Sequence, residues 1–231
     1  MTGVPAGKTW FETLKKSFVD VPVSGEQGIN TSAFLEASEA TTTLFGTYRS
    51  NGTQDSGSLC VDLLGSVAFT PVKNDMLGNV KKVRERQLAS PGTSENLQDL
   101  CKAEIASKSH KATEGLLWLV RGLDFTAQAL RNDLTNNAGV QITEAKPKKE
   151  LADSFRDAYK NSLAPHHSFM VKPIFSAAMS ATPYRKDLYA KMLGQGASPE
   201  TLSSEFEKWL SALESQVSIL KTFLASKDAK W

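Results

Sequence analysis

Three polar residues in the segment GSVAFTPVKNDMLGNVKKVRERQ, residues 65–87, have types and spacing that suit ligand binding. Asp75, Asn79 and Lys82 stand at positions i, i+4 and i+7, so on an α-helix they fall along one stripe. The stripe offers both hydrogen-bond donors and acceptors, which suits a ligand rich in hydroxyl groups. An apolar stripe runs beside it, formed by Val72, Met76, Val80 and Val83. The spacing alone also fits an ordinary amphipathic helix with a solvated face, so both interpretations stay open here.

Two further residues have side chains that can recognise a sugar or an amide. Trp118 has a flat face on which a sugar ring can stack, and its N–H needs a partner if it is buried. His167 shares a helical spacing with Val171, Ile174 and Ala178, which predicts that it points towards the core. A core tryptophan and a hydrogen-bonded structural histidine are the alternative interpretations.

The elements that must position these residues are helical, because apolar residues recur with helical periodicity almost throughout the chain. Residues 115–130 are apolar on nearly every side, which is typical of a central helix covered on both sides. The segment 166–181 is predicted as a helix interrupted by Pro173 and ended by Pro183. Other helices are expected at 32–45, after Pro71, and at 94–107, 149–163 and 202–224, with a short amphipathic segment at 10–18. Strand-like alternation is scarce, so the predicted fold class is all-α.

Composition excludes several classes of protein. The net charge of +2 is too small to indicate nucleic acid as a partner. The sequence has no apolar run long enough to span a membrane, and residues 1–16 lack the apolar region of a secretory signal. Two cysteines, Cys60 and Cys101, make no disulfide framework. We therefore predict a cytoplasmic protein.

No motif for catalysis stands out in the sequence. The three histidines have no cysteine or carboxylate partners at metal-ligand spacing, and no serine or cysteine has a recognisable nucleophile setting. The segment GVPAGKT at 3–9 is one residue too short between its glycines for a phosphate-binding loop. The prediction is a protein that is not an enzyme and that uses no metal and no cofactor.

Three separated motifs, taken together, resemble the glycolipid transfer protein family, in particular its fungal members of the heterokaryon-incompatibility HET-C type. They are GSVAFTPVKNDMLGNVKKV at 65–83, LLWLVRGLDF at 116–125 and HHSFMVKPIFSAAMSATPY at 166–184. The resemblance extends from about residue 9 to the C-terminus, apart from residues 46–61. It implies a single all-α domain over 1–231: a two-layer sandwich of about eight helices that encloses a cavity for lipid chains.

The resemblance also implies a role for each candidate residue. Asp75, Asn79 and Lys82 would hydrogen-bond the headgroup sugar and the ceramide amide region, with Asp75 taking the amide N–H. Trp118 would be the stacking platform for the first sugar ring, and His167 would bond the amide carbonyl. A buried amide left unpaired costs about 1–3 kcal/mol, so this pairing would discriminate against lipids without an amide.

The family's other branch carries ceramide-1-phosphate and has basic side chains in place of the Asn and Trp. This chain keeps Asn79 and Trp118, and a lone Lys82 beside Asp75 is a poor cage for a phosphate. The expected ligand is therefore a neutral glycosphingolipid with one or two sugars, moved without chemical conversion between membranes that the protein touches transiently at their cytosolic faces. A glycolipid sensor in fungal vegetative incompatibility, read by an unknown protein partner, is the alternative hypothesis.

The sequence departs from the family pattern in two regions. Phe169 stands where animal members carry an interfacial Trp, so it is the predicted membrane contact, and Pro173 is expected to kink the helix nearby. Residues 46–61 form an inserted loop, either a retained short intron translated in frame or a genuine insertion. Residues 1–8 are expected to form a flexible extension.

Overall fold

The computed structural model describes residues 3–25, 27–46 and 63–231, and in these residues the fold is helical. The inserted loop expected at 46–61 lies outside the described residues except for Gly46. β-Pairing in the described ranges is limited to isolated bridges such as Thr9 with Leu193. The eight α-helices of the described residues are α1 Thr31–Thr41, α2 Thr70–Ala89, α3 Leu97–Ala106, α4 Lys111–Asn136, α5 Leu151–Asn161, α6 Lys172–Ser180, α7 Arg185–Met192 and α8 Pro199–Ala225. The all-α prediction is confirmed.

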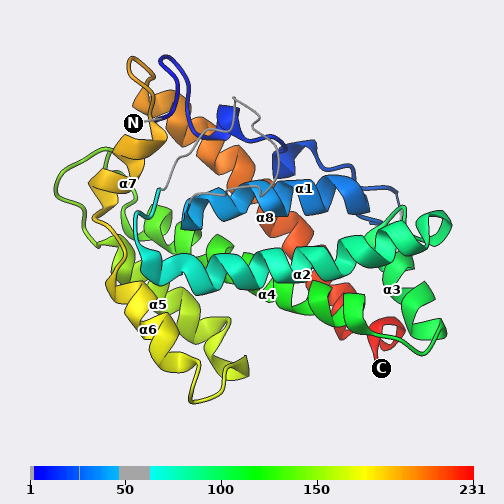
Figure 1. Ribbon diagram of the computed structural model, residues 1–231. Coiled ribbons are helices and arrows are strands. Elements are labelled where there is room, and N and C mark those ends of the chain that lie inside the picture. The colour runs from blue at the N-terminus through cyan, green and yellow to red at the C-terminus, as the bar shows by residue number, and fades with distance from the viewer. Residues whose placement is uncertain (1–2, 26, 47–62) are drawn as a thin grey trace.

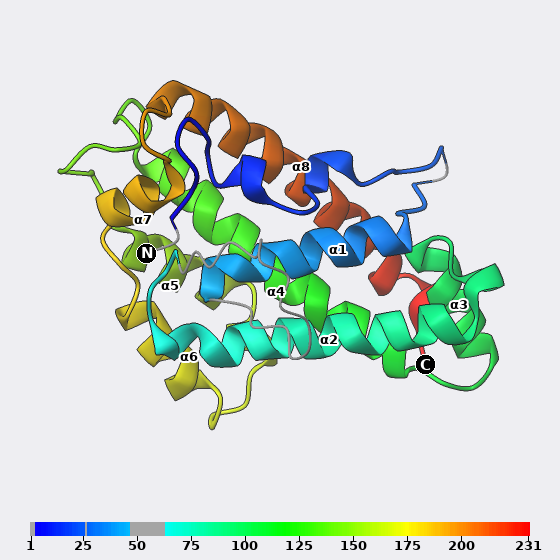
Figure 2. The same ribbon diagram turned by 45° about the horizontal axis from the view of Figure 1, so that its top comes forward.

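The long helices lie in two layers that cross each other (Figure 1). In the view of Figure 1, α1 and α2 lie in front, and α4 and α8 run behind them. Helix α4 contacts α2, α5 and α8, which confirms its predicted central position. At one end of the molecule lie α5, α6 and α7; at the other, α3 meets the short C-terminal helix η7, Lys227–Ala229 (Figure 2).

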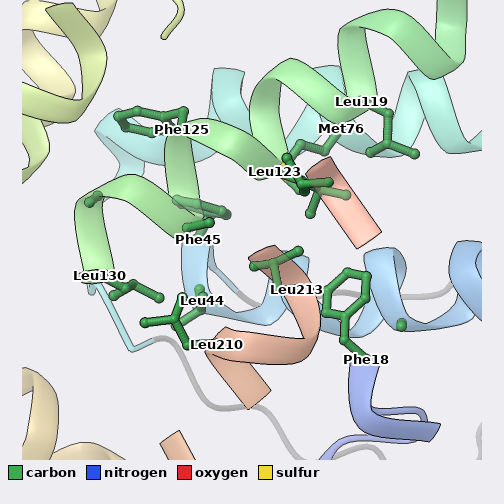
Figure 3. Close-up of a cluster of buried hydrophobic side chains, with 14 of the residues drawn as sticks. Phe18, Leu44, Phe45, Met76, Leu119, Leu123, Phe125, Leu130, Leu210 and Leu213 are labelled. Carbon is green, nitrogen blue, oxygen red and sulfur yellow. The ribbon is translucent and has the colours of Figure 1, made fainter. Parts of the chain in front are cut away.

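Large apolar side chains fill the space between the layers. Phe18, Phe45, Met76, Leu123 and Leu213 come from different elements and point into one shared interior (Figure 3). Each of these five side chains is at most 2% exposed. The buried cluster includes residues of all eight α-helices, so the layers share one hydrophobic core.

Helices α2 and α8 begin where their sequences place the starting signals. Pro71 stands in the first turn of α2, where its missing N–H leaves no hydrogen bond unmade. In α8 the side chain of Ser198 accepts a hydrogen bond from the N–H of Thr201, and Pro199 is the first helical residue. The predicted boundaries at 202–224 agree with α8 to within three residues at each end.

The prediction for residues 166–181 is wrong in its first half. Helix α6 begins only at Lys172, so Pro173 lies in its first turn and neither interrupts nor kinks it. A proline is tolerated there because the first N–H groups of a helix have no intrahelical acceptor. His167 follows the short helix η6, Ala164–His166, in an extended conformation, so it shares no helical stripe with Val171. Helix α7 was not predicted.

The N-terminal segment differs from the expected free extension in its described part. The N–H of Gly7 donates to the carbonyl of Gln195, and the N–H of Gly194 donates to that of Lys8, both at 2.8 Å. A Cβ on Gly194 would come within 1.8 Å of the Pro5 carbonyl oxygen, so only glycine allows this close approach. Residues 3–8 are therefore held against the chain after α7.

A buried ion pair joins α4 to α7. Asp133 and Arg185 are 0% and 1% exposed, and the Nε of Arg185 lies 3.0 Å from one carboxylate oxygen of Asp133. The hydroxyl of Tyr189 donates to the same carboxylate at 2.6 Å, and Arg185 also donates to the carbonyls of Gln141 and Ile142. Burial raises the pKa of Asp133, and the hydrogen bond from Tyr189 and the charge of Arg185 oppose this rise.

None of the helices in the described part of the chain is both long and apolar enough to cross a membrane.

Candidate functional site

The polar row predicted on α2 is present as a chain of hydrogen bonds. The Nζ of Lys82 donates to the Oδ1 of Asn79, and the Nδ2 of Asn79 donates to the Oδ2 of Asp75, both at 3.1 Å. Asn79 is only 2% exposed, whereas Asp75 is exposed and Lys82 is half-buried. The central amide is therefore fixed by its two neighbours, and the outer groups keep the capacity to bind something else.

The carboxyl group of Asp75 is partly desolvated, although the residue as a whole is exposed. This desolvation raises the pKa of Asp75 above its ordinary value, and the positive charge of Lys82 partly offsets the rise. A carboxylate in such a place gains from accepting an N–H hydrogen bond, because its hydration is already incomplete.

Two glycines let α4 approach the row closely. A Cβ on Gly115 would lie 3.0 Å from the Cβ of Lys82 and 3.3 Å from the carbonyl oxygen of Asn79. A Cβ on Gly122 would lie 3.6 Å from the Cγ of Met76. Because Gly115 faces Asn79 and Lys82 and Gly122 faces Met76, helices α2 and α4 run in opposite directions. Trp118 stands three residues after Gly115 and four before Gly122, so it shares the face of α4 that is turned towards α2.

Trp118 and His167 are brought together from distant parts of the chain. Trp118 is half-buried on α4, and its ring is nearly parallel to that of His167, with an interplanar angle of 18° and centroids 6.1 Å apart. His167 also contacts Phe175, at 4.5 Å between centroids, and its Nδ1 lies 3.1 Å from the hydroxyl of Tyr159. The structure thus joins two of the predicted residues, although His167 reaches its place from a connecting segment.

Desolvation lowers the pKa of His167, and the positive charge of neighbouring His166, Arg121 and Lys172 lowers it further. The imidazole is therefore neutral at pH 7, with one ring nitrogen able to donate and the other able to accept.

Sequence reasoning missed three residues of this site. Arg121 lies on the next turn of α4 and places its guanidinium carbon 4.7 Å from the centre of the Trp118 ring. Its position three residues after Trp118 is a signal that helical spacing offers. Tyr159 and Gly115 matter only through tertiary contacts, which no local pattern shows.

Phe169 lies outside this cluster of polar groups, on the surface. It is 83% exposed, and the adjacent Met170 is 71% exposed, both in the segment before α6. Val67, in the short helix η4, Val67–Phe69, is 90% exposed, and η4 contacts α6. Three exposed apolar side chains therefore lie at the end of the molecule that carries α6.

The site as a whole offers an acceptor, several donors and a flat aromatic ring within one region. Asp75 can accept, Lys82 and one nitrogen of His167 can donate, and Trp118 can stack. This set of groups can bind a polar ligand that carries hydroxyl and amide groups.

Known proteins resemble this chain in sequence and in fold. The family model described as "Glycolipid transfer protein (GLTP)" matches residues 29–194. The chain is 54% identical over 231 residues to a glycolipid transfer protein of Aureobasidium melanogenum, covering 100% of both chains. It is 29% identical over 225 residues to the human pleckstrin homology domain-containing family A member 8, covering 93% of this chain but only 38% of that protein.

Solved structures give the same result. The crystal structure of HET-C2, a fungal glycolipid transfer protein, superposes with a TM-score of 0.81 at 52% identity, covering 96% of this chain and 100% of that one. A structure of FAPP2, described as selecting simple glycosphingolipids with the GLTP fold, superposes with a TM-score of 0.76 at 27% identity, covering 96% and 98%. The family match, the identity and the shared fold lead to one conclusion: this chain belongs to the glycolipid transfer protein family.

Proposed function

We propose that this protein carries neutral glycosphingolipids between membranes without changing them chemically. The observation that carries the proposal is the hydrogen-bonded row of Asp75, Asn79 and Lys82 on α2, which faces the side of α4 that also carries Trp118. The relatives described as glycolipid transfer proteins support it. They do not favour the alternative of a glycolipid sensor.

Each residue of the site has a role in this proposal. The carboxylate of Asp75 accepts the ceramide amide N–H, and His167 donates to the amide carbonyl. Asn79 and Lys82 hydrogen-bond sugar hydroxyls, and Trp118 stacks on the first sugar ring. The amide is thus paired at both ends, which avoids the cost of about 1–3 kcal/mol for a buried unpaired polar group.

The hydrocarbon chains would enter the interior between the two helical layers. That interior is lined by apolar side chains such as Phe45, Leu123 and Phe125, each at most 2% exposed. Chains taken up there must displace some of these side chains from one another. Transfer needs no energy source, because the chains leave one apolar medium for another.

Membrane contact would occur through Phe169, Met170 and Val67, the exposed apolar side chains at the end of the molecule that carries α6. The adjacent Lys172 is exposed and supplies a positive charge for anionic headgroups. We infer a cytoplasmic protein that touches the cytosolic faces of membranes only transiently and that is not an enzyme.

A vesicle-to-vesicle assay tests the proposed ligand class. Fluorescent glucosylceramide should move at least about tenfold faster than fluorescent ceramide-1-phosphate, which corresponds to a difference of about 1.4 kcal/mol. The reason is that Lys82 stands beside the carboxylate of Asp75, whose negative charge opposes the binding of a doubly charged phosphate. Faster transfer of the phosphate lipid would refute the ligand class.

Gly115→Ala should slow glucosylceramide transfer without removing any ligand-binding side chain. The added methyl group would press on the Lys82 side chain and the Asn79 carbonyl oxygen and push α2 away from α4. Overpacking of this kind costs about 1–3 kcal/mol of stability, offset by about 1 kcal/mol of gained helix propensity. Transfer rate and thermal denaturation measure the two effects.

Gly78→Ala on α2 is the matched control, because nothing lies within 4 Å of a Cβ at Gly78. This variant should be more stable than wild type and should transfer at the wild-type rate. Equal transfer by both glycine variants would show that the close approach of α2 and α4 does not shape the site.

A further inference from the structure

Tyr159 is the direct hydrogen-bond partner of His167. It lies on α5, and its hydroxyl oxygen is 3.1 Å from the Nδ1 of His167. Its ring stacks on that of Phe175 with centroids 5.1 Å apart and an interplanar angle of 10°, and it meets the edge of Phe125 at 6.4 Å. These contacts hold the phenol in one orientation towards the imidazole.

The direction of this hydrogen bond decides what His167 can offer a ligand. A neutral imidazole has one N–H donor and one acceptor nitrogen, so the role of Nδ1 sets the role of Nε2. If the phenol donates to Nδ1, the ring proton sits on Nε2 and the outer nitrogen is a donor. If Nδ1 donates to the phenol, Nε2 is an acceptor.

The surroundings favour the phenol as donor. Desolvation raises the pKa of Tyr159, so the hydroxyl keeps its proton, and it lowers the pKa of His167, so the imidazole stays neutral. A phenol is a good donor, and an imidazole nitrogen with a free lone pair is a good acceptor. Nδ1 of His167 is the acceptor that lies within reach of this hydroxyl among the described residues.

We propose that Tyr159 is a positioning residue that holds His167 in the tautomer with the proton on Nε2, so that His167 always presents a donor to the lipid. This inference rests on the proposed function and deepens it. Asp75 then offers only acceptors and His167 only a donor, which matches the N–H and the carbonyl of one amide. Without Tyr159 the imidazole could turn or change tautomer and present an acceptor to the carbonyl.

Nuclear magnetic resonance of the unloaded wild-type protein at pH 7 gives the first test. Long-range proton–nitrogen spectra distinguish a protonated ring nitrogen from an unprotonated one. We expect Nδ1 of His167 to be unprotonated and Nε2 to be protonated. A protonated Nδ1 would overturn the inference, and this result does not depend on any variant folding.

Tyr159→Phe gives the second test, because it removes the hydroxyl and keeps the stacked ring. Its glucosylceramide transfer should fall about three- to tenfold, the effect of losing one hydrogen bond. Mixed tautomers of His167 should appear in the same spectra. Tyr184→Phe is the matched control, because Tyr184 is 67% exposed, and it should behave as wild type.

A double-mutant cycle separates positioning from a structural role. In a His167→Ala background, Tyr159→Phe should have no further effect on transfer, because the hydroxyl acts through the imidazole. An equal loss in both backgrounds would overturn the inference. If wild type itself moves no glucosylceramide while its His167 tautomer is as expected, the proposed function fails and the tautomer assignment stands.

Discussion

Asp75→Val should slow glucosylceramide transfer by about 5- to 150-fold, the range that corresponds to about 1–3 kcal/mol. The substitution removes the acceptor proposed for the ceramide amide N–H and leaves that N–H unpaired in a desolvated place. It also deprives the buried Asn79 of the carboxylate that receives its Nδ2. Initial rates between vesicles measure the effect, with circular dichroism as a check on folding.

Asp157→Val on α5 is the matched control, because Asp157 is exposed and its ion pair with Lys149 is a surface one at 3.7 Å. It should transfer at the wild-type rate. Asp75→Asn should lie between wild type and Asp75→Val, since an amide oxygen still accepts a hydrogen bond but carries no charge. Wild-type transfer by Asp75→Val would remove Asp75 from the proposed site.

Asp133→Ala should lower the free energy of unfolding by about 3–5 kcal/mol, the usual cost of leaving a buried charge without its partner. Arg185 would keep its two backbone carbonyl partners but lose both contacts with the carboxylate, and the hydroxyl of Tyr189 would lose its acceptor. Urea denaturation followed by circular dichroism measures the loss.

Two comparisons make this second prediction specific. Arg131 lies on α4, as Asp133 does, and forms ion pairs near the surface with Glu207 and Glu214 of α8. Arg131→Met breaks these pairs and should lower the free energy of unfolding by about 1 kcal/mol or less. The double substitution Asp133→Leu with Arg185→Met should recover much of the stability, because apolar side chains of similar volume can replace a buried ion pair. A loss for Asp133→Ala as small as that for Arg131→Met would contradict the prediction.

The long helices could be predicted from the sequence because their patterns are long and their ends are marked. Helix α8 has apolar residues at helical spacing over most of its length, with Ser198 and Pro199 at its start. In α4 the apolar residues occur on all sides, as expected of a helix that contacts α2, α5 and α8. In these helices the local sequence preference and the tertiary contacts favour the same structure, so the local pattern predicts the helix correctly.

The segment around His167 shows where local pattern was insufficient. Apolar residues after His167 match helical spacing, but Pro173 takes its preferred place in a first turn and α6 starts late. His167 therefore meets Trp118 through a connecting segment, and no periodicity predicts that contact. The same limit applies to Tyr159, whose relation to His167 arises from the packing of α5 on the segment before α6.

The row on α2 was predictable in composition but not in its internal bonding. Lysine is a donor only, so the atom of Asn79 that faces Lys82 must be the amide oxygen, and the nitrogen must face Asp75. The hydrogen bonds of the row therefore all run in one direction, from the cationic donor Lys82 to the anionic acceptor Asp75. In the proposed binding mode, the amide N–H of the lipid lies at the Asp75 end of the row, which is the N-terminal end, and the sugar hydroxyls lie towards Lys82. In the proposed binding mode, α2 would therefore set the orientation of the lipid headgroup through the order of its three side chains.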